Sequence, residues 1–214
     1  MSVALPVLLV CAGCGPSTPA ENKSVTAGKV RTPETGHVEN NTYTNEYFHF
    51  SLSVPDGWSV PELGRVNGIE KEWRNQTLNS KSLGMRAVAG DAPSPSIFMM
   101  SRSPIEPWVP DNQYFIIMAA RLPKVTSRRY LEQASKIIIG SKTGFTQKGE
   151  IIDRVIGNLP YCELTLVLTT AERSMVQRQI AIADGTYILV FTLTAPSEIE
   201  LGVMEAVLSS AKFD

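Results

Sequence analysis

A strict alternation of apolar and polar residues marks the first folded part of the chain. Every second residue from 48 to 54 is large and apolar, and the residues between them are polar. A period of two predicts a half-buried β-strand with His49 on its solvent side. Residues 55–57 read Pro-Asp-Gly, which predicts a turn, and Trp58 is expected to return to the core.

Longer apolar runs predict the rest of a sheet. Residues 97–100 and 114–119 indicate two buried strands, joined by a proline-rich loop that carries Trp108. Trp108 is expected either to pack on the body or to stand out as a binding knob. Further runs predict four more strands at 150–157, 161–169, 174–183 and 186–194. Asp184-Gly185 lies between the last two and predicts a hairpin.

Two stretches have the spacing of amphipathic helices, and a third, 66–90, is ambiguous because glycines interrupt it. One helix is expected from a cap at Ser127 to Gly140, with an apolar stripe at Tyr130, Leu131, Ala134, Ile137 and Ile138. The other begins with the capping pair Ser197 and Glu200. Its stripe is Leu201, Met204, Val207, Leu208 and Ala211, and Phe213 is expected to hold the carboxyl end.

Four consecutive strands joined by short turns require antiparallel pairing, and the amphipathic helices must cover the resulting sheet. The sequence therefore predicts an α+β fold, mainly antiparallel β-sheet covered by two or three α-helices. We place this domain at residues 42–214, since the preceding stretch has almost no large apolar side chains.

The start of the chain resembles a bacterial lipoprotein leader. Residues 3–13 are largely apolar but too few to span a bilayer, and Ala12-Gly13 precede Cys14. Small residues before a cysteine allow cleavage there, and the thiol can then carry a diacylglycerol. We expect residues 1–13 to be a signal peptide, Cys14 to be lipidated, and 14–41 to be a disordered tether.

Alternatives to this leader remain open. Cys11 stands where lipoprotein leaders usually carry Leu, and no Lys or Arg precedes the apolar run. An ordinary cleaved leader, or a buried amino-terminal strand, would also accommodate the sequence. Gly15 follows the cysteine instead of the aspartate that retains some lipoproteins at the inner membrane. We therefore expect a periplasmic domain anchored in the envelope, with the outer membrane favoured.

Two patches of the domain carry a family resemblance. The first comprises Tyr43-Thr44-Asn45, Phe48-His49-Phe50 and Pro55-Asp56-Gly57-Trp58; the second comprises Gly185-Thr186-Tyr187 and Ser210-Ala211-Lys212-Phe213. Together they resemble the PsbP-like fold, shared with the Ran-binding Mog protein and many bacterial lipoproteins. The resemblance implies an α/β/α sandwich and a non-catalytic, partner-binding role. It implies no photosynthetic role, because further features of the photosystem members after the Trp are missing.

The charge balance and the motifs limit which functions the sequence supports. The chain has 20 basic and 21 acidic residues and two histidines, so no basic footprint for nucleic acid is present. Cys162 shares a strand face with leucines and is expected to be a small buried hydrophobe. Arg178 lies among apolar neighbours, where an arginine extends outward to solvent, is paired with an acid, or contacts an anion. Carboxylates are scattered on expected loops at Asp56, Glu62, Glu70, Glu72 and Asp111, without calcium-site spacing.

We therefore assign no catalytic, cofactor or metal site, and expect no cofactor and no enzyme. The leading hypothesis is a lipid-anchored domain that binds another envelope protein. The first alternative is a carrier of a small apolar ligand held between sheet and helix. The second is an enzyme with an unrecognised site, which requires one pocket to gather His49, Cys162, Arg178 or several carboxylates.

Overall fold

The computed structural model describes residues 33, 35–63, 96–104, 112–140, 144–156, 159–171 and 174–213. Several predictions from the sequence lie outside these residues. They are the leader with Cys14, the ambiguous segment 66–90 with Glu70 and Glu72, and the loop with Trp108 and Asp111. Neither helix within the described ranges is long and apolar enough to cross a bilayer.

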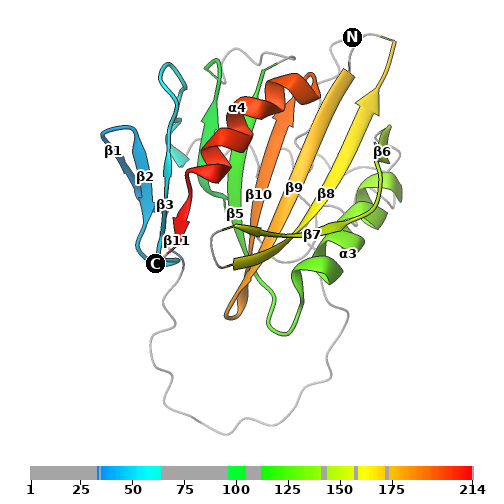
Figure 1. Cartoon of the computed structure of the whole chain (residues 1–214), viewed down its shortest axis with the longest axis horizontal. Helices are drawn as coiled ribbons and strands as arrows, with labels where there is room; N and C mark the ends of the chain where they lie inside the picture. Colours follow the sequence, from blue (N-terminus) through cyan, green and yellow to red (C-terminus); the bar gives the residue numbers. More distant parts are fainter. Residues whose placement is uncertain are drawn as a thin grey trace, which may run out of the picture.

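A large antiparallel sheet forms the centre of the domain (Figure 1). Its strand order is β4-β5-β10-β9-β8-β6, and β7 pairs with β8. The strands are β4 (Ser96–Ser101), β5 (Tyr114–Arg121), β6 (Phe145–Gln147), β7 (Ile152–Ile156), β8 (Leu159–Thr169), β9 (Ser174–Asp184) and β10 (Tyr187–Ala195). The predicted α+β class is confirmed, as are the strands expected around 97–100, 114–119 and in the last four runs.

Helix α3 (Ser127–Gly140) covers one face of this sheet. Its buried Leu131, Ala134 and Ile138 pack against leucines of β8 in one apolar cluster. The helix has the expected stripe and the expected end. The cap is one residue earlier than predicted, because the hydroxyl of Thr126, and not of Ser127, accepts the Arg129 N–H at 3.2 Å.

The opposite face carries α4 (Glu198–Ser209) and a small sheet of order β1-β2-β3-β11 (Figure 1). The small sheet consists of β1 (His37–Glu39), β2 (Thr42–Asn45), β3 (Phe50–Ser53) and β11 (Lys212–Phe213). Aromatic side chains join it to the large sheet. Phe50 lies 5.9 Å from Phe191 of β10 and 5.6 Å from Phe213, measured between ring centroids. Trp58 is buried, as expected.

The folded unit begins earlier than the predicted boundary at residue 42. Strand β1 lies within the stretch expected to be tether, and it pairs with β2 through a two-residue turn. Asn40 and Asn41 both have positive φ, as a tight hairpin turn requires. All three side chains of β1 are exposed, so main-chain hydrogen bonds form this strand and no hydrophobic pattern in the sequence predicts it.

The turn between β9 and β10 also differs by one residue from the prediction. Asp184 pairs with Tyr187, so the two-residue loop is Gly185-Thr186 and not Asp184-Gly185. Gly185 has a φ of 57°, a conformation that glycine adopts without a steric penalty. Asp184 therefore remains the last residue of a strand.

Candidate functional site

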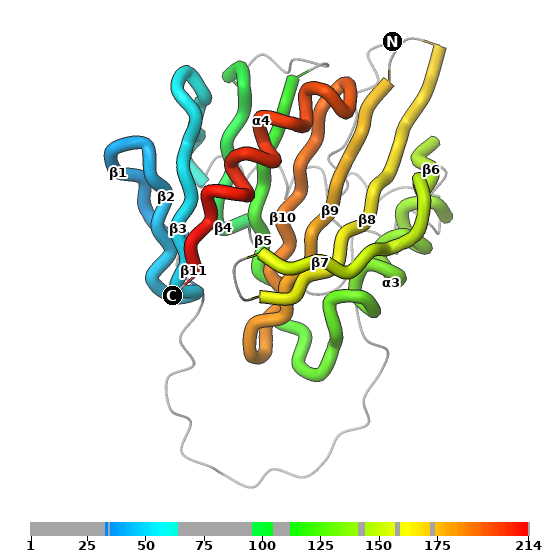
Figure 2. The backbone as a smooth tube through the Cα atoms, viewed as in Figure 1, coloured from blue at the N-terminus to red at the C-terminus, as the bar shows by residue number. Residues whose placement is uncertain are grey.

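A cleft of about 550 Å³ opens on the α4 side of the large sheet. Ten residues line it: Phe48, His49, Leu159, Ile182, Ala183, Asp184, Leu189, Ala211, Lys212 and Phe213. They come from four places in the fold, namely the β2–β3 turn, the β7–β8 hairpin, the β9–β10 hairpin and the end of α4 with β11. Figure 2 shows how β7 and the start of β8 run across the large sheet. Leu159 is the first residue of β8 and lines the cleft.

Local sequence sets the shape of each wall. Asn45 accepts a hydrogen bond from the Phe48 N–H at 3.0 Å, which closes the β2–β3 turn. His49 then has a φ of 52°, a left-handed conformation that histidine tolerates better than most side chains. Ser197 caps the start of α4 by accepting the Glu200 N–H, as the sequence predicted, and the end of the same helix leads into the opposite wall of the cleft. Beyond α4, Lys212 and Phe213 pair with β3.

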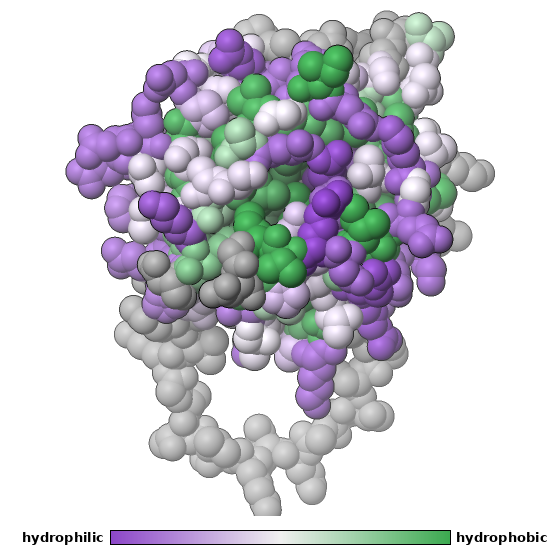
Figure 3. Space-filling view, in the orientation of Figure 1, coloured by the Kyte–Doolittle hydropathy of each residue, from purple (hydrophilic) through white to green (hydrophobic). Residues whose placement is uncertain are grey.

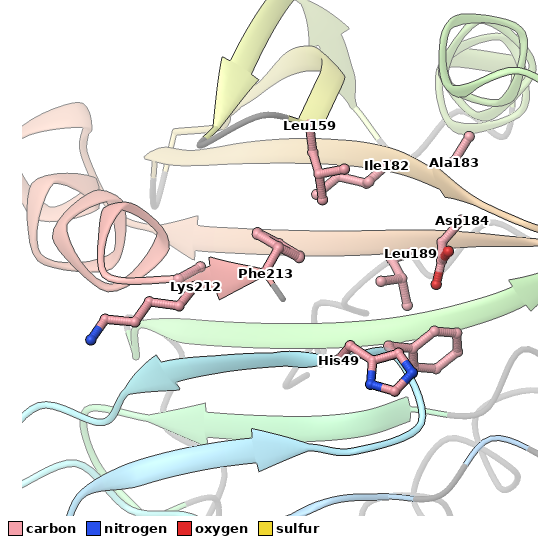
Figure 4. Close-up of a pocket in the computed structure, with 10 residues that line it drawn as sticks. His49, Leu159, Ile182, Ala183, Asp184, Leu189, Lys212 and Phe213 are labelled. Atoms are coloured by element: carbon pink, nitrogen blue, oxygen red, sulfur yellow. The ribbon is translucent and has the colours of Figure 1, made fainter.

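The cleft has an apolar floor and a polar rim. Leu159, Ile182 and Phe213 extend towards one another in Figure 4, whereas the polar side chains of Asp184 and His49 lie at the other end of the lining. The ammonium group of Lys212 points away from the floor in the same view. The expectation that His49 lies on the solvent side is confirmed, since its side chain is exposed. An arrangement of this kind suits an apolar group with a polar end.

Arg178 lies on the same face of the sheet, in a chain of ion pairs beside the cleft. Its Nε is 3.3 Å from a Glu163 carboxylate oxygen, and its Nη1 contacts Glu205 of α4. Arg154 of β7 lies 3.3 Å from the other Glu163 oxygen. The prediction that Arg178 is paired with an acid is confirmed. Because two arginines and two glutamates cancel in charge, this group has little electrostatic attraction for a free anion.

Cys162 lies on the opposite face of the sheet, because neighbouring residues of a strand point to opposite sides. Its thiol donates to a carboxylate oxygen of Asp153 at 3.1 Å, and Asp153 pairs with Arg128 at 2.7 Å. Burial, followed by the hydrogen bond to Asp153, raises the pKa of the Cys162 thiol to about 11. The thiol therefore stays protonated at neutral pH and behaves as the buried hydrophobe that the sequence predicted.

Cys162 lies on the face of the sheet opposite Arg178, and neither lines the cleft that His49 lines, so the structure does not gather these three side chains in one pocket. Asp56 accepts a hydrogen bond from Asn41 at 2.7 Å, away from the cleft. Within the described part of the chain no group of three His, Cys, Asp or Glu side chains could hold a metal ion. No sequence signal indicated that Asp184 and Lys212 line the same cleft, since nothing local links a hairpin end to the last strand.

No protein-family model and no curated protein sequence matches this chain. Among solved structures it is similar to cyanobacterial PsbP (CyanoP) from Synechocystis sp. PCC 6803, at 11% identity and a TM-score of 0.50, over 89% of this chain and 98% of that one. It is also similar to LpqN, involved in cell envelope biogenesis of Mycobacterium tuberculosis, at 13% identity and a TM-score of 0.44, over 75% and 79%.

A third similar structure is the immunity protein TplEi of the T6SS from Pseudomonas aeruginosa, complexed with a peptide, at 11% identity and a TM-score of 0.45, over 77% and 95%. The likeness to CyanoP confirms the resemblance in fold drawn from the sequence. The chain therefore has a PsbP-like fold. At such low sequence identities, these structural similarities give no information about a ligand or a partner.

Proposed function

We propose that this chain is a lipid-anchored binding domain of a bacterial cell envelope, which receives apolar side chains of a partner protein in its cleft. The open cleft is the observation that carries the binding part. Burying an apolar group against its floor would remove apolar surface from water on both partners. Asp184 and His49 on the rim could then fix the orientation of the bound group through hydrogen bonds.

The anchoring part depends on Cys14 and on the residues around it. Small residues precede the thiol, and the polar stretch after it would link lipid to domain. Mass spectrometry of the mature amino terminus should find an acylated cysteine. Cys14→Ser should release the chain from the membrane fraction. A mature protein that begins at Met1 with an unmodified thiol would contradict the anchoring proposal and leave the binding proposal untouched.

The β7–β8 hairpin offers a matched pair of positions for testing the cleft. Leu159 lines the cleft, whereas Val155 is 66% exposed on the same hairpin and does not line it. A photo-reactive amino acid at position 159 should give one discrete protein adduct in cells, and the same probe at 155 should not. The identified partner should bind the purified chain and lose binding with Leu159→Asp but not with Val155→Asp. Equal adducts at both positions would contradict the proposal.

The size of the cleft favours a second candidate, a small apolar ligand. Its volume lies in the range of about 300–1,000 Å³ that small-molecule sites occupy. Native mass spectrometry of the chain purified from its own cells would then show a bound non-protein mass that Leu159→Asp removes. That result, combined with no adduct at position 159, would replace the partner-protein proposal with the carrier function.

A further inference from the structure

The outer surface of α4 carries an apolar stripe that the domain leaves uncovered. Ile199 is 91% exposed and Val203 is 46% exposed. Gly202 and Ala206 are exposed between and beside them. These four residues are spaced at i, i+3, i+4 and i+7, so they lie on one face of the helix, opposite the buried Leu201, Met204, Val207 and Leu208. We call these four residues the α4 outer stripe.

Charged side chains of α4 are held at the flanks of this stripe. Glu198 pairs with Lys148, and Glu205 pairs with Arg178. On the other flank, Glu200 accepts hydrogen bonds from Ser197 at 2.8 Å and Gln113 at 3.4 Å. A surface helix usually presents charge to water along its outer face. Here all three glutamates of α4 are engaged by the domain itself, which leaves the outer stripe uncharged.

Large and small residues alternate along the stripe, in the order Ile199, Gly202, Val203, Ala206. We infer that the stripe binds a second copy of this chain, with the two α4 helices antiparallel about a two-fold axis between Gly202 and Val203. That axis places Ile199 opposite the partner's Ala206 and Gly202 opposite the partner's Val203. Each large side chain then meets a small one, as a self-complementary interface requires. In-register parallel helices would instead set Ile199 against its own copy and leave a gap at Gly202.

Charges on the flanks fit the same arrangement. A two-fold axis across antiparallel helices brings like flanks together, so the Lys148–Glu198 pair of one copy lies beside the Arg178–Glu205 pair of the other. Each pair combines a cation with a carboxylate, so the two flanks present charges of both signs to each other and can be arranged with opposite charges facing. Figure 3 shows this face, with hydrophobic atoms along α4 and hydrophilic atoms on the side of β9 and β8. The flanks carry no excess of cations, so they offer no electrostatic attraction for an anionic lipid surface.

Disulfide cross-linking distinguishes this arrangement from others. In the antiparallel pair, two Val203→Cys residues are offset by only about 1.5 Å along the helix axis, whereas two Ser209→Cys residues are about 20 Å apart. A disulfide needs Cα atoms within about 7 Å. On mild oxidation of the full-length chain in detergent, Val203→Cys should form a 203–203 link roughly tenfold faster than Ser209→Cys forms a 209–209 link. Peptide mass spectrometry separates these links from links through the native cysteines.

Charge exchange at the same position gives an independent measurement. The full-length chain should sediment as a dimer, and Val203→Glu and Val203→Lys should each sediment as monomers with an unchanged circular dichroism spectrum. An equal mixture of the two variants should regain the dimer, and salt should weaken it. A monomeric wild-type chain, equal linking at 203 and 209, or a mixture that stays monomeric would overturn the proposal. A Val203→Cys adduct with a different protein would also overturn it, by making α4 the surface for that protein.

Discussion

Arg178 offers a test of how the large sheet tolerates charge beneath α4. The side chain of Glu163 is 8% exposed and has two cationic neighbours, Arg178 at 18% and Arg154 at 54% exposure. Arg178→Met removes the more buried cation and leaves the carboxylate with the exposed one. Breaking a fully buried ion pair costs about 3–5 kcal/mol. Because Arg154 remains and Arg178 is partly exposed, we expect a loss of about 2–3 kcal/mol in the free energy of unfolding.

A double-mutant cycle separates the interaction from the substitutions. Glu163→Gln alone leaves the partly exposed guanidinium of Arg178 with Glu205 as its remaining partner and should cost a similar amount. The double variant Glu163→Gln/Arg178→Met contains neither charge, and the new methionine joins the apolar neighbours Val176 and Ile180. We expect it to lie within about 1 kcal/mol of the wild type, far from the sum of the single losses.

Urea unfolding followed by far-ultraviolet circular dichroism, at one fixed chain concentration, measures all four free energies. Arg154→Met is the matched control and should cost no more than about 1 kcal/mol, because its partner keeps the inner arginine. If the two single losses simply add in the double variant, the ion pairs do not act together and the reasoning is refuted. The same holds if Arg178→Met is as mild as Arg154→Met.

Four further outcomes follow from the geometry. Iodoacetamide at pH 8 should modify Cys162 slowly in the folded protein and rapidly in urea, because a thiol with a pKa of about 11 is almost fully protonated at pH 8. Mass spectrometry follows the labelling, and fast labelling of the folded chain would contradict this expectation. Burial raises the pKa of Cys162 to about 11 and that of Tyr43 to about 12, above their ordinary values of 9.0 and 10.0, so both stabilise the fold below pH 9. This contribution should be lost as pH rises towards 12, which urea titrations across that range would show, and a flat profile would contradict it. Ser197→Ala should cost about 1 kcal/mol in thermal unfolding by removing the α4 cap, whereas the control Ser209→Ala should cost less. Gly36→Ala should detach β1 and speed amide hydrogen exchange in β1 and β2 only. Residue 36 has a φ of 68°, and the new Cβ would lie 2.5 Å from a carbonyl oxygen of β2. Unchanged exchange would show that the backbone accommodates the methyl group.

Much of this architecture could be predicted from the sequence because its signals are local. Period-two alternation marked β3, longer apolar runs marked most strands of the large sheet, and the spacing of apolar residues marked α3 and α4 with their buried faces. The capping pair Ser197 and Glu200 fixed the start of α4 to the residue. The leucines that share a strand face with Cys162 were enough to predict that its thiol is buried and behaves as a small hydrophobe. These signals depend on residues a few positions apart, where backbone geometry alone sets which side chains are neighbours.

Strands held by main-chain pairing gave no such signal. β1 has three exposed side chains, and β11 has only two residues. Each exists because an adjacent strand offers hydrogen-bonding groups in register, which is a property of the partner as much as of the segment. The one-residue shifts have related causes. Thr126 and Ser127 both carry a hydroxyl that can cap α3, and the register of β9 with β10 decides which two residues form their turn.

The sequence by itself determined the class of fold, the positions of most strands and helices, and which residues of each face the core. Only the tertiary structure decided that Leu159, Asp184 and Phe213 share one cleft, and that Glu163 and Glu205 neutralise Arg178. Those residues are far apart along the chain, and they meet because the β7–β8 hairpin runs across the sheet while β11 returns to β3. Such long-range contacts depend on how whole elements pack against each other. The periodicity within one element gives no information about which other element will lie against it.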